Sequence, residues 1–163
     1  MTDNRKRAEP TEGLTEGVVT SRDGTTIAFD QRGEGPPLIL VAGALSDRSD
    51  ARKLATLLAE HFTVINYDRR GRGDSGNTEP YSVDREIEDL EALIEAAGGS
   101  AHVFGSSSGA VLALRAASSG VNVTKLALFE PPIRLRDADD VAKAPTDSAA
   151  RARELIQAGR RND

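Results

Sequence analysis

The sequence has 163 residues, 38% of them hydrophobic, which is enough to bury the core of one domain. Its 26 Asp and Glu residues outnumber its 21 Lys and Arg residues, and the net charge of -5 excludes a cationic surface for nucleic acid or anionic lipid. Cysteine is absent, which excludes disulfides, thiolate metal ligands and a cysteine nucleophile. No apolar run has the length of a signal peptide or membrane span, so we expect a cytoplasmic protein without membrane partners.

The N-terminal third begins with a predicted tail and a hairpin. Residues 1–14 are polar, include Pro10 and lack apolar periodicity, so we expect a disordered tail. Two β-favouring runs follow, at 17–20 and 25–31, on either side of a turn sequence that contains Gly24. The pattern predicts two antiparallel strands at the start of the fold.

Strands and helices then alternate along the chain. A continuous apolar run at 38–41 predicts a strand buried on both faces, and 62–67 predicts another buried strand. Two further strands are predicted at 101–104 and 123–129. Apolar residues at helical spacing predict helices at 50–59, from the N-cap Ser82 to Gly98-Gly99, and at 110–117. This alternation predicts an α/β fold, in which helices cover both faces of a mostly parallel sheet.

The C-terminal segment differs from this core. From residue 135 the chain is polar, and residues 147–158 predict one further helix. The acidic cluster of Asp137, Asp139 and Asp140 has no Gly-centred loop or closing Glu, so we interpret it as a solvated turn and not as a metal site. We therefore divide the chain into a tail at 1–14, a core at 15–134 and a separate segment at 135–163.

A serine motif stands between a predicted strand and a predicted helix. Residues 105–109 read Gly-Ser-Ser-Ser-Gly and fit the pattern G-x-S-x-G. A serine at such a sharp turn projects into the crevice above a sheet, and the strained turn requires small residues two positions before and after it. Gly105 and Gly109 meet this requirement, so we predict Ser107 as a nucleophile. The side chains of Ser106 and Ser108 are expected to be there for their small size.

A second loop is a candidate for binding the oxygen of a substrate carbonyl. The predicted strand 38–41 is followed by Ala42-Gly43-Ala44, whose small residues allow the backbone to approach a ligand closely. Backbone N–H groups in this position, together with one from the residue after the nucleophile, form an oxyanion hole. We predict the N–H groups of Ala44 and Ser108 as the two donors; a tight strand-to-helix turn is the alternative for the loop alone.

Over residues 17–132 the sequence resembles the α/β-hydrolase family, in its esterase and haloperoxidase-like group. Residues 68–75, Asp-Arg-Arg-Gly-Arg-Gly-Asp-Ser, resemble the family's Asp-x-Arg-Gly-x-Gly-x-Ser loop, and residues 129–132 resemble the segment after its sixth strand. The resemblance implies the strand order 1-2-4-3-5-6, an acyl-enzyme mechanism, and a chain that carries the N-terminal portion of the family fold, with 135–163 as the start of its cap. Ala42 stands where the family usually has His, which affects the positioning of the loop more than its backbone donors.

The stretch 71–76 also matches G-x-G-x-x-G, a dinucleotide-binding pattern. The third glycine of that pattern opens a helix, whereas here Asn77-Thr78-Glu79-Pro80 intervene. We therefore expect the loop to form a wall of the active-site mouth, and we expect neither a nucleotide nor another cofactor or metal.

A serine nucleophile works with a catalytic base and an acid, and the sequence offers few candidates for these two roles. A serine nucleophile needs a base, which in the family is a His after the eighth strand. The chain has only His61 and His102, and both are predicted at the opposite end of the sheet, so both are interpreted as structural. Glu130 follows the sixth strand; it is a candidate acid, or it holds the following loop by hydrogen bonds, and we do not choose between these.

These features predict a serine-dependent hydrolase of an ester, lactone or related acyl compound, incomplete before the acid and the His. The alternative is a non-catalytic remnant that binds a ligand or partner without turnover. An Asp-nucleophile enzyme is disfavoured by the serine at the turn. In either case the last predicted strand, 123–129, is an apolar edge through which we expect self-association.

Overall fold

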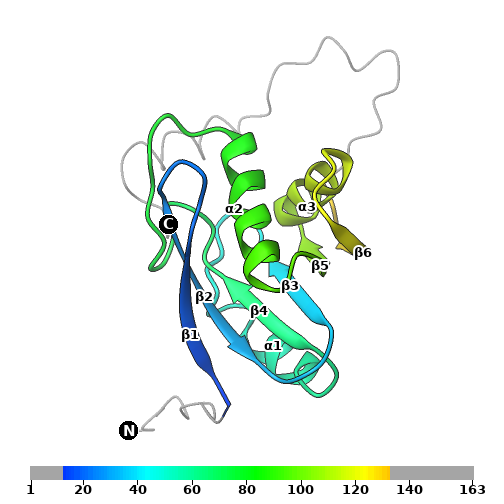
Figure 1. Ribbon diagram of the computed structural model, residues 1–163. Coiled ribbons are helices and arrows are strands. Elements are labelled where there is room, and N and C mark those ends of the chain that lie inside the picture. The colour runs from blue at the N-terminus through cyan, green and yellow to red at the C-terminus, as the bar shows by residue number, and fades with distance from the viewer. Residues whose placement is uncertain (1–12, 133–163) are drawn as a thin grey trace, which may run out of the picture.

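The computed structural model describes residues 13–132, which form a mixed sheet with helices on both faces (Figure 1). The predicted segment 135–163, with its helix, and all but two residues of the predicted tail lie outside the described residues. In chain order the elements are β1 (Thr15–Thr20), β2 (Thr26–Arg32), β3 (Pro37–Val41), α1 (Arg52–Leu58), β4 (Thr63–Tyr67), α2 (Val83–Ala96), β5 (Ala101–Ser106), α3 (Ser108–Ser118) and β6 (Val123–Phe129).

The strands lie in the order β1-β2-β4-β3-β5-β6, which confirms the predicted order. β1 pairs with β2, and β2 with β4, in antiparallel fashion. β3 pairs in parallel with β4 and β5, and β5 with β6. The carboxyl ends of β3, β4, β5 and β6 therefore meet at one edge of the sheet.

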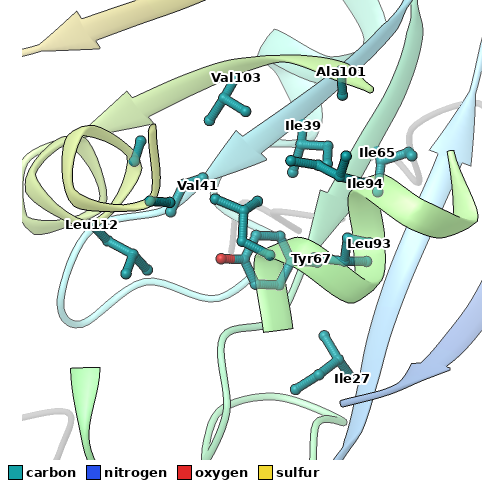
Figure 2. Close-up of a cluster of buried hydrophobic side chains, with 13 residues drawn as sticks. Ile27, Ile39, Val41, Ile65, Tyr67, Leu93, Ile94, Ala101, Val103 and Leu112 are labelled. Atoms are coloured by element: carbon teal, nitrogen blue, oxygen red, sulfur yellow. The ribbon is translucent and has the colours of Figure 1, made fainter. Parts of the chain in front are cut away.

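Alternate residues of the central strands enter two separate cores, as expected for strands buried on both faces. In β3, Ile39 and Val41 pack with α2 and α3, whereas Leu38 and Leu40 pack with α1. Figure 2 shows the larger core, in which Tyr67 lies among side chains from the sheet and both helices. The two faces of the sheet are thus covered by α2 and α3 on one side and by α1 on the other.

The helix α2 begins and ends where its sequence signals indicate. The Ser82 side chain accepts a hydrogen bond from the backbone N–H of Arg85, which caps the first turn. At the other end, Gly98 and Gly99 both have positive φ, a conformation that favours glycine and terminates a helix.

Two predicted boundaries at the serine motif were wrong. β5 continues to Ser106 and α3 begins at Ser108, whereas the sequence predicted that the strand ends at 104 and the helix begins at 110. Glycine and serine are poor strand formers, but Gly105 and Ser106 pair with Leu128 and Phe129 of β6, and this pairing extends the strand. The turn at Ser107 is therefore a single residue.

Candidate active site

Ser107 is the one residue between β5 and α3, and its backbone is strained. Its φ is 51° and its ψ is -122°, outside the regions that residues other than glycine usually occupy. The N–H of Ser107 donates to the carbonyl of Phe129 at 2.9 Å, and its carbonyl accepts from the N–H of Ala110 at 3.0 Å. The residue is exposed at the carboxyl edge of the sheet, so a ligand above the sheet can reach its side chain.

The two glycines of the motif allow very close backbone approaches. A Cβ on Gly105 would lie 2.6 Å from the Cα of Ala110, and a Cβ on Gly109 would lie 2.2 Å from the carbonyl oxygen of Val41. Both distances are shorter than any ordinary contact, and the opposing atoms belong to the backbone. Glycine is therefore required at both positions for α3 to pack against β3 and β5 as it does.

The loop after β3 lies directly beside the serine. A Cβ on Gly43 would lie 3.5 Å from the Cβ of Ser107 and 4.0 Å from its Oγ. Ala44, the next residue, is exposed at this edge. Ser108 is the first residue of α3, so its N–H belongs to the helical N–H groups that have no partner within the helix. The structure thus brings the predicted nucleophile and the predicted oxyanion loop together.

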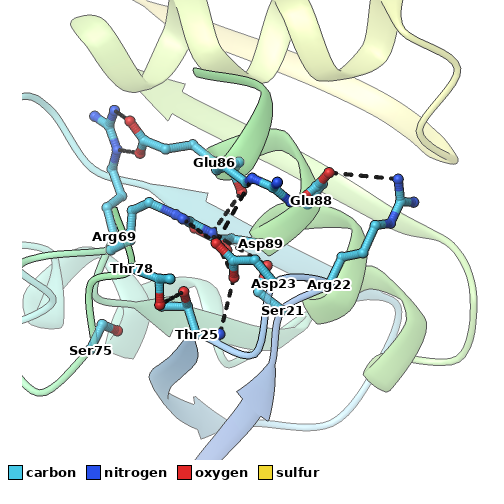
Figure 3. A network of polar contacts seen from close by, with 12 residues as sticks. Ser21, Arg22, Asp23, Thr25, Arg69, Ser75, Thr78, Glu86, Glu88 and Asp89 are labelled. Atoms are coloured by element: carbon cyan, nitrogen blue, oxygen red, sulfur yellow. Dashed lines mark hydrogen bonds and ion pairs between the residues drawn. The ribbon is translucent and has the colours of Figure 1, made fainter. Parts of the chain in front are cut away.

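A buried arginine connects this loop to the serine motif and to α2. The Arg69 Nε and Nη2 donate to the two carboxylate oxygens of Glu86 at 2.5 and 2.7 Å, a two-bond ion pair visible in Figure 3. The Nη1 of Arg69 donates to the carbonyl of Ala42 at 3.2 Å and to the Oγ of Ser108 at 3.1 Å. The expectation that the Ser108 side chain is there only for its size was therefore wrong, because its hydroxyl accepts this hydrogen bond.

Glu86 carries a charge in the interior because it is fully partnered. Besides Arg69, the hydroxyl of Tyr81 donates to its Oε1 at 2.7 Å. Burial alone would raise the pKa of Glu86, but the hydrogen bonds and charge of Arg69 outweigh burial, and the pKa lies below its ordinary value. Burial and the bond to Glu86 raise the pKa of Tyr81. At neutral pH the pair is therefore an ionised carboxylate and a guanidinium, with a neutral phenol.

The neighbouring Arg70 has a different set of partners, on the hairpin side. It donates two hydrogen bonds to Asp89 of α2, at 2.6 and 2.8 Å, and two to Asp23 of the β1–β2 turn, at 2.9 and 3.5 Å. The hydrogen bond from Arg70, with those from Thr25, holds the pKa of Asp23 well below its ordinary value. Arg69 and Arg70 therefore hold the loop after β4 against α2 at two successive points.

Asp68 and Arg48 fix the shape of the two loops. Asp68 accepts hydrogen bonds from the backbone N–H groups of Arg48 at 2.8 Å and Asp74 at 2.9 Å. The guanidinium of Arg48 also contacts Asp68, and it forms ion pairs with Asp30 at 3.1 Å and Asp74 at 2.6 Å. A Cβ on Gly73 would lie only 2.1 Å from the Asp68 carboxylate, so that glycine leaves room for this contact.

A pocket of about 540 Å³ opens next to the oxyanion loop. Arg72 stands in its wall and donates from Nη1 to the carbonyl of Gly43 at 2.8 Å. The stretch 71–73 lines the pocket, and α2 begins only at Val83, which does not fit the dinucleotide pattern. Ser107 does not line the pocket. Ala44, the predicted oxyanion donor, is the residue that the pocket lining shares with the predicted site. The lining consists of Ala44, Leu45, Ser46, Asp47, Arg70, Gly71, Arg72, Gly73, Asn77, Glu79, Tyr81 and Glu86.

The remaining predicted residues lie at different places. His102 is near the start of β5, at the edge of the sheet opposite Ser107, where its Nδ1 lies 2.6 Å from the Thr124 hydroxyl and its ring meets that of Phe62 edge to face. His61 is exposed and precedes β4, also at that opposite edge. Glu130 follows β6, is exposed and has a φ of 47°. Neither histidine is placed to take a proton from Ser107.

Sequence reasoning missed Arg69, Arg72, Tyr81 and Glu86. One signal was present, because Glu86 stands in the apolar stripe of α2, between Val83 and Leu90 at helical spacing. A carboxylate on a buried helix face indicates a buried cationic partner, although it does not identify that partner.

Within residues 13–132, no cluster of three or more His, Cys, Asp or Glu side chains could hold a metal ion. In the same part of the chain, none of the helices has the length and apolar character needed to cross a membrane.

Comparison with known proteins identifies relatives of the chain. Residues 38–162 match the model of a family described as the alpha/beta hydrolase family. An uncharacterised hydrolase of Bacillus subtilis, YraK, is 39% identical over 95 residues, which are 56% of this chain and 35% of that protein. The N-formylmaleamate deformylase of Pseudomonas putida is 37% identical over 105 residues, which are 62% of this chain and 39% of that protein.

The solved structures give the same result. The crystal structure of an alpha/beta hydrolase from Sphaerobacter thermophilus is 57% identical and superposes with a TM-score of 0.79. The match covers 88% of this chain and 55% of that structure. The chain thus spans little more than a third of the two curated relatives it is compared with and about half of the solved structure.

Proposed function

The chain belongs to the alpha/beta hydrolase family, and we propose that within this family Ser107 is the nucleophile for hydrolysis of an ester, lactone or related acyl substrate. One observation carries the proposal: Ser107 is an exposed residue with positive φ between β5 and α3, and the loop 42–44 lies against it. A strained, solvent-facing serine has no role in packing, whereas a nucleophile needs this position.

In the proposed mechanism the Oγ of Ser107 attacks the carbonyl carbon of the substrate while a base takes the hydroxyl proton. The negative oxygen of the tetrahedral intermediate accepts hydrogen bonds from the N–H groups of Ala44 and Ser108. The intermediate then breaks its bond to the alcohol, which leaves with the proton from the base. Water, activated by the same base, attacks the acyl-enzyme, which releases the acid and restores Ser107.

The base in this proposal is a histidine outside these 163 residues, because His61 and His102 both lie at the opposite edge of the sheet. A polypeptide of residues 1–163 alone is accordingly expected to be inactive. Glu130 stays a candidate for the acid, since it lies at the carboxyl end of β6. We also propose that the protein is cytoplasmic and that its binding partner is its substrate, a small acyl compound.

The relatives support hydrolysis at the level of their names. One curated relative is named an uncharacterised hydrolase, and another an N-formylmaleamate deformylase. Neither histidine of the chain lies near Ser107, and this favours a second candidate function. In that case the chain binds a ligand in the pocket beside Ala44 without turnover.

The test uses the full-length protein, meaning residues 1–163 together with the part that supplies the proposed histidine. It compares three forms of this protein on alkyl and aryl esters. The wild type is expected to hydrolyse at least one of them faster than buffer, and Ser107→Ala to abolish this rate. Ser106→Ala, one residue earlier in β5, is the matched control and is expected to keep most of the activity. A folded, full-length wild type without hydrolysis, or hydrolysis that survives Ser107→Ala, would favour the non-catalytic candidate.

A further inference from the structure

Arg72 holds its guanidinium at the border between the pocket and the oxyanion loop. The residue lies between two glycines of positive φ in the loop after β4, and its side chain is half-buried. One N–H donates to the carbonyl of Gly43 at 2.8 Å. A guanidinium carries five N–H donors in a planar fork, so this bond leaves others for a ligand in the pocket. Gly43 directly precedes Ala44, the proposed oxyanion donor, so a ligand held by Arg72 would lie next to the reacting carbonyl.

The charge of Arg72 is not matched by a carboxylate, unlike that of its neighbours. Arg48, Arg69 and Arg70 each form ion pairs with Asp or Glu side chains. Among residues 13–132, no carboxylate lies within ion-pair distance of Arg72. The charge of Glu86 acts on Arg72, but both carboxylate oxygens of Glu86 are already bonded to Arg69 and Tyr81. The group of Arg69, Arg72 and Glu86 therefore has one positive charge in excess.

The other two carboxylates of the pocket lining are held in place by neighbouring backbone N–H groups and do not pair with Arg72. Asp47 accepts a hydrogen bond from the N–H of Ser49 at 2.7 Å, and Glu79 accepts one from the N–H of Tyr81 at 2.9 Å. Burial, followed by the positive charge of Arg69, lowers the pKa of Arg72, which is the direction expected for a guanidinium that lacks a counter-ion. An anion in the pocket would supply that counter-ion.

We propose that Arg72 binds a carboxylate of the substrate, so that the preferred substrate is an ester or related acyl compound of a short acid that carries a second, free carboxylate. This inference rests on the proposed function. The Arg72 fork fits a carboxylate with two parallel hydrogen bonds, and the half-buried wall of the pocket screens that interaction less than open water would. The bond to Gly43 keeps the fork in place, so the substrate carboxylate orients the carbonyl toward Ser107.

The test separates binding from turnover by using the full-length Ser107→Ala variant, which cannot form an acyl-enzyme. It is titrated by calorimetry with monoethyl succinate and with ethyl butyrate, which differ by a carboxylate in place of a methyl group. We expect the anionic ester to bind at least about tenfold more tightly, because hydrogen bonds to a charged group are stronger than those to a neutral one. Adding Arg72→Met is expected to remove this preference, and Arg72→Lys to keep part of it because the positive charge remains.

Two controls exclude indirect effects. Lys125→Met removes an exposed cation from β6, where it pairs in register with His102 at the edge of the sheet opposite Ser107, and is expected to leave the preference unchanged. Circular dichroism checks that each variant is folded. Equal or undetectable binding of the two esters, or a preference that survives Arg72→Met, would overturn the inference. Hydrolysis by the wild type is measured separately: if it hydrolyses both esters equally well, the proposed function holds and only the role of Arg72 fails.

Discussion

Glu86→Gln is the change whose effect on stability the structure defines most sharply. The side chains of Arg69 and Glu86 are only 6% and 3% exposed, so the glutamine would leave the guanidinium charge in the interior without a counter-ion. Loss of one partner from such a buried pair costs about 3–5 kcal/mol. Urea unfolding of the full-length protein at neutral pH measures this cost. The matched control is Glu88→Gln in the same helix, whose pairs with the more exposed Arg85 and Arg22 are each expected to contribute only about 0.3–0.5 kcal/mol.

A double variant tests the same reasoning from the other direction. Arg69→Met with Glu86→Leu removes both charges and replaces them with apolar side chains, so most of the lost stability is expected to return. The hydrogen bonds from Arg69 to Ala42 and Ser108 are still lost, so turnover is expected to fall mainly in kcat and less in KM. A Glu86→Gln cost below about 1 kcal/mol, or one equal to that of Glu88→Gln, would refute the account of the buried pair.

Three further outcomes are expected. Gly109→Ala should lower the free energy of unfolding in urea by about 1–3 kcal/mol or more, because the added Cβ would lie 2.2 Å from a backbone oxygen. In the control Gly76→Ala the nearest atom is 3.5 Å from the added Cβ, so the free energy of unfolding should change little. Equal effects of the two substitutions would contradict the steric argument. Asp23 has a folded-state pKa well below its ordinary value, so its stabilising contribution is fully present above about pH 4 and decreases progressively as the pH falls below that. The difference in urea midpoint between wild type and Asp23→Asn should therefore shrink as the pH falls below about 4, and a constant difference would argue against the linkage. A polypeptide of residues 1–163 should self-associate in analytical ultracentrifugation because β6 presents Leu128 and Phe129, and Phe129→Lys should weaken this; a monomer at all concentrations would contradict it.

The sequence predicted the features that depend on local patterns. The buried strand around Ile39 is a continuous apolar run, and α2 has both an N-cap serine and a terminating glycine pair. The strand order came from the resemblance to the family, because strand pairing is a long-range property that periodicity does not encode. The glycines at 105 and 109 were readable because a sharp turn between a strand and a helix restricts which residues fit.

The charged groups beneath the site could not be predicted in the same way. Arg69 and Glu86 are 17 positions apart, and they meet only because the loop after β4 folds back over α2. Many acidic residues of the chain were equally plausible partners for any arginine. The fit of Arg72 against the Gly43 carbonyl likewise depends on how the β3 and β4 loops pack together, which is decided by tertiary contacts through Asp68.

Reaction of the full-length protein with a fluorophosphonate, followed by mapping of the labelled peptide by mass spectrometry, tests the central claim most directly. The probe reacts with a serine only when neighbouring groups activate it. The account predicts a single label on Ser107 that is lost in Ser107→Ala and retained in Ser106→Ala. A label on Ser106 or Ser108, or no label on a folded, full-length protein, would contradict it.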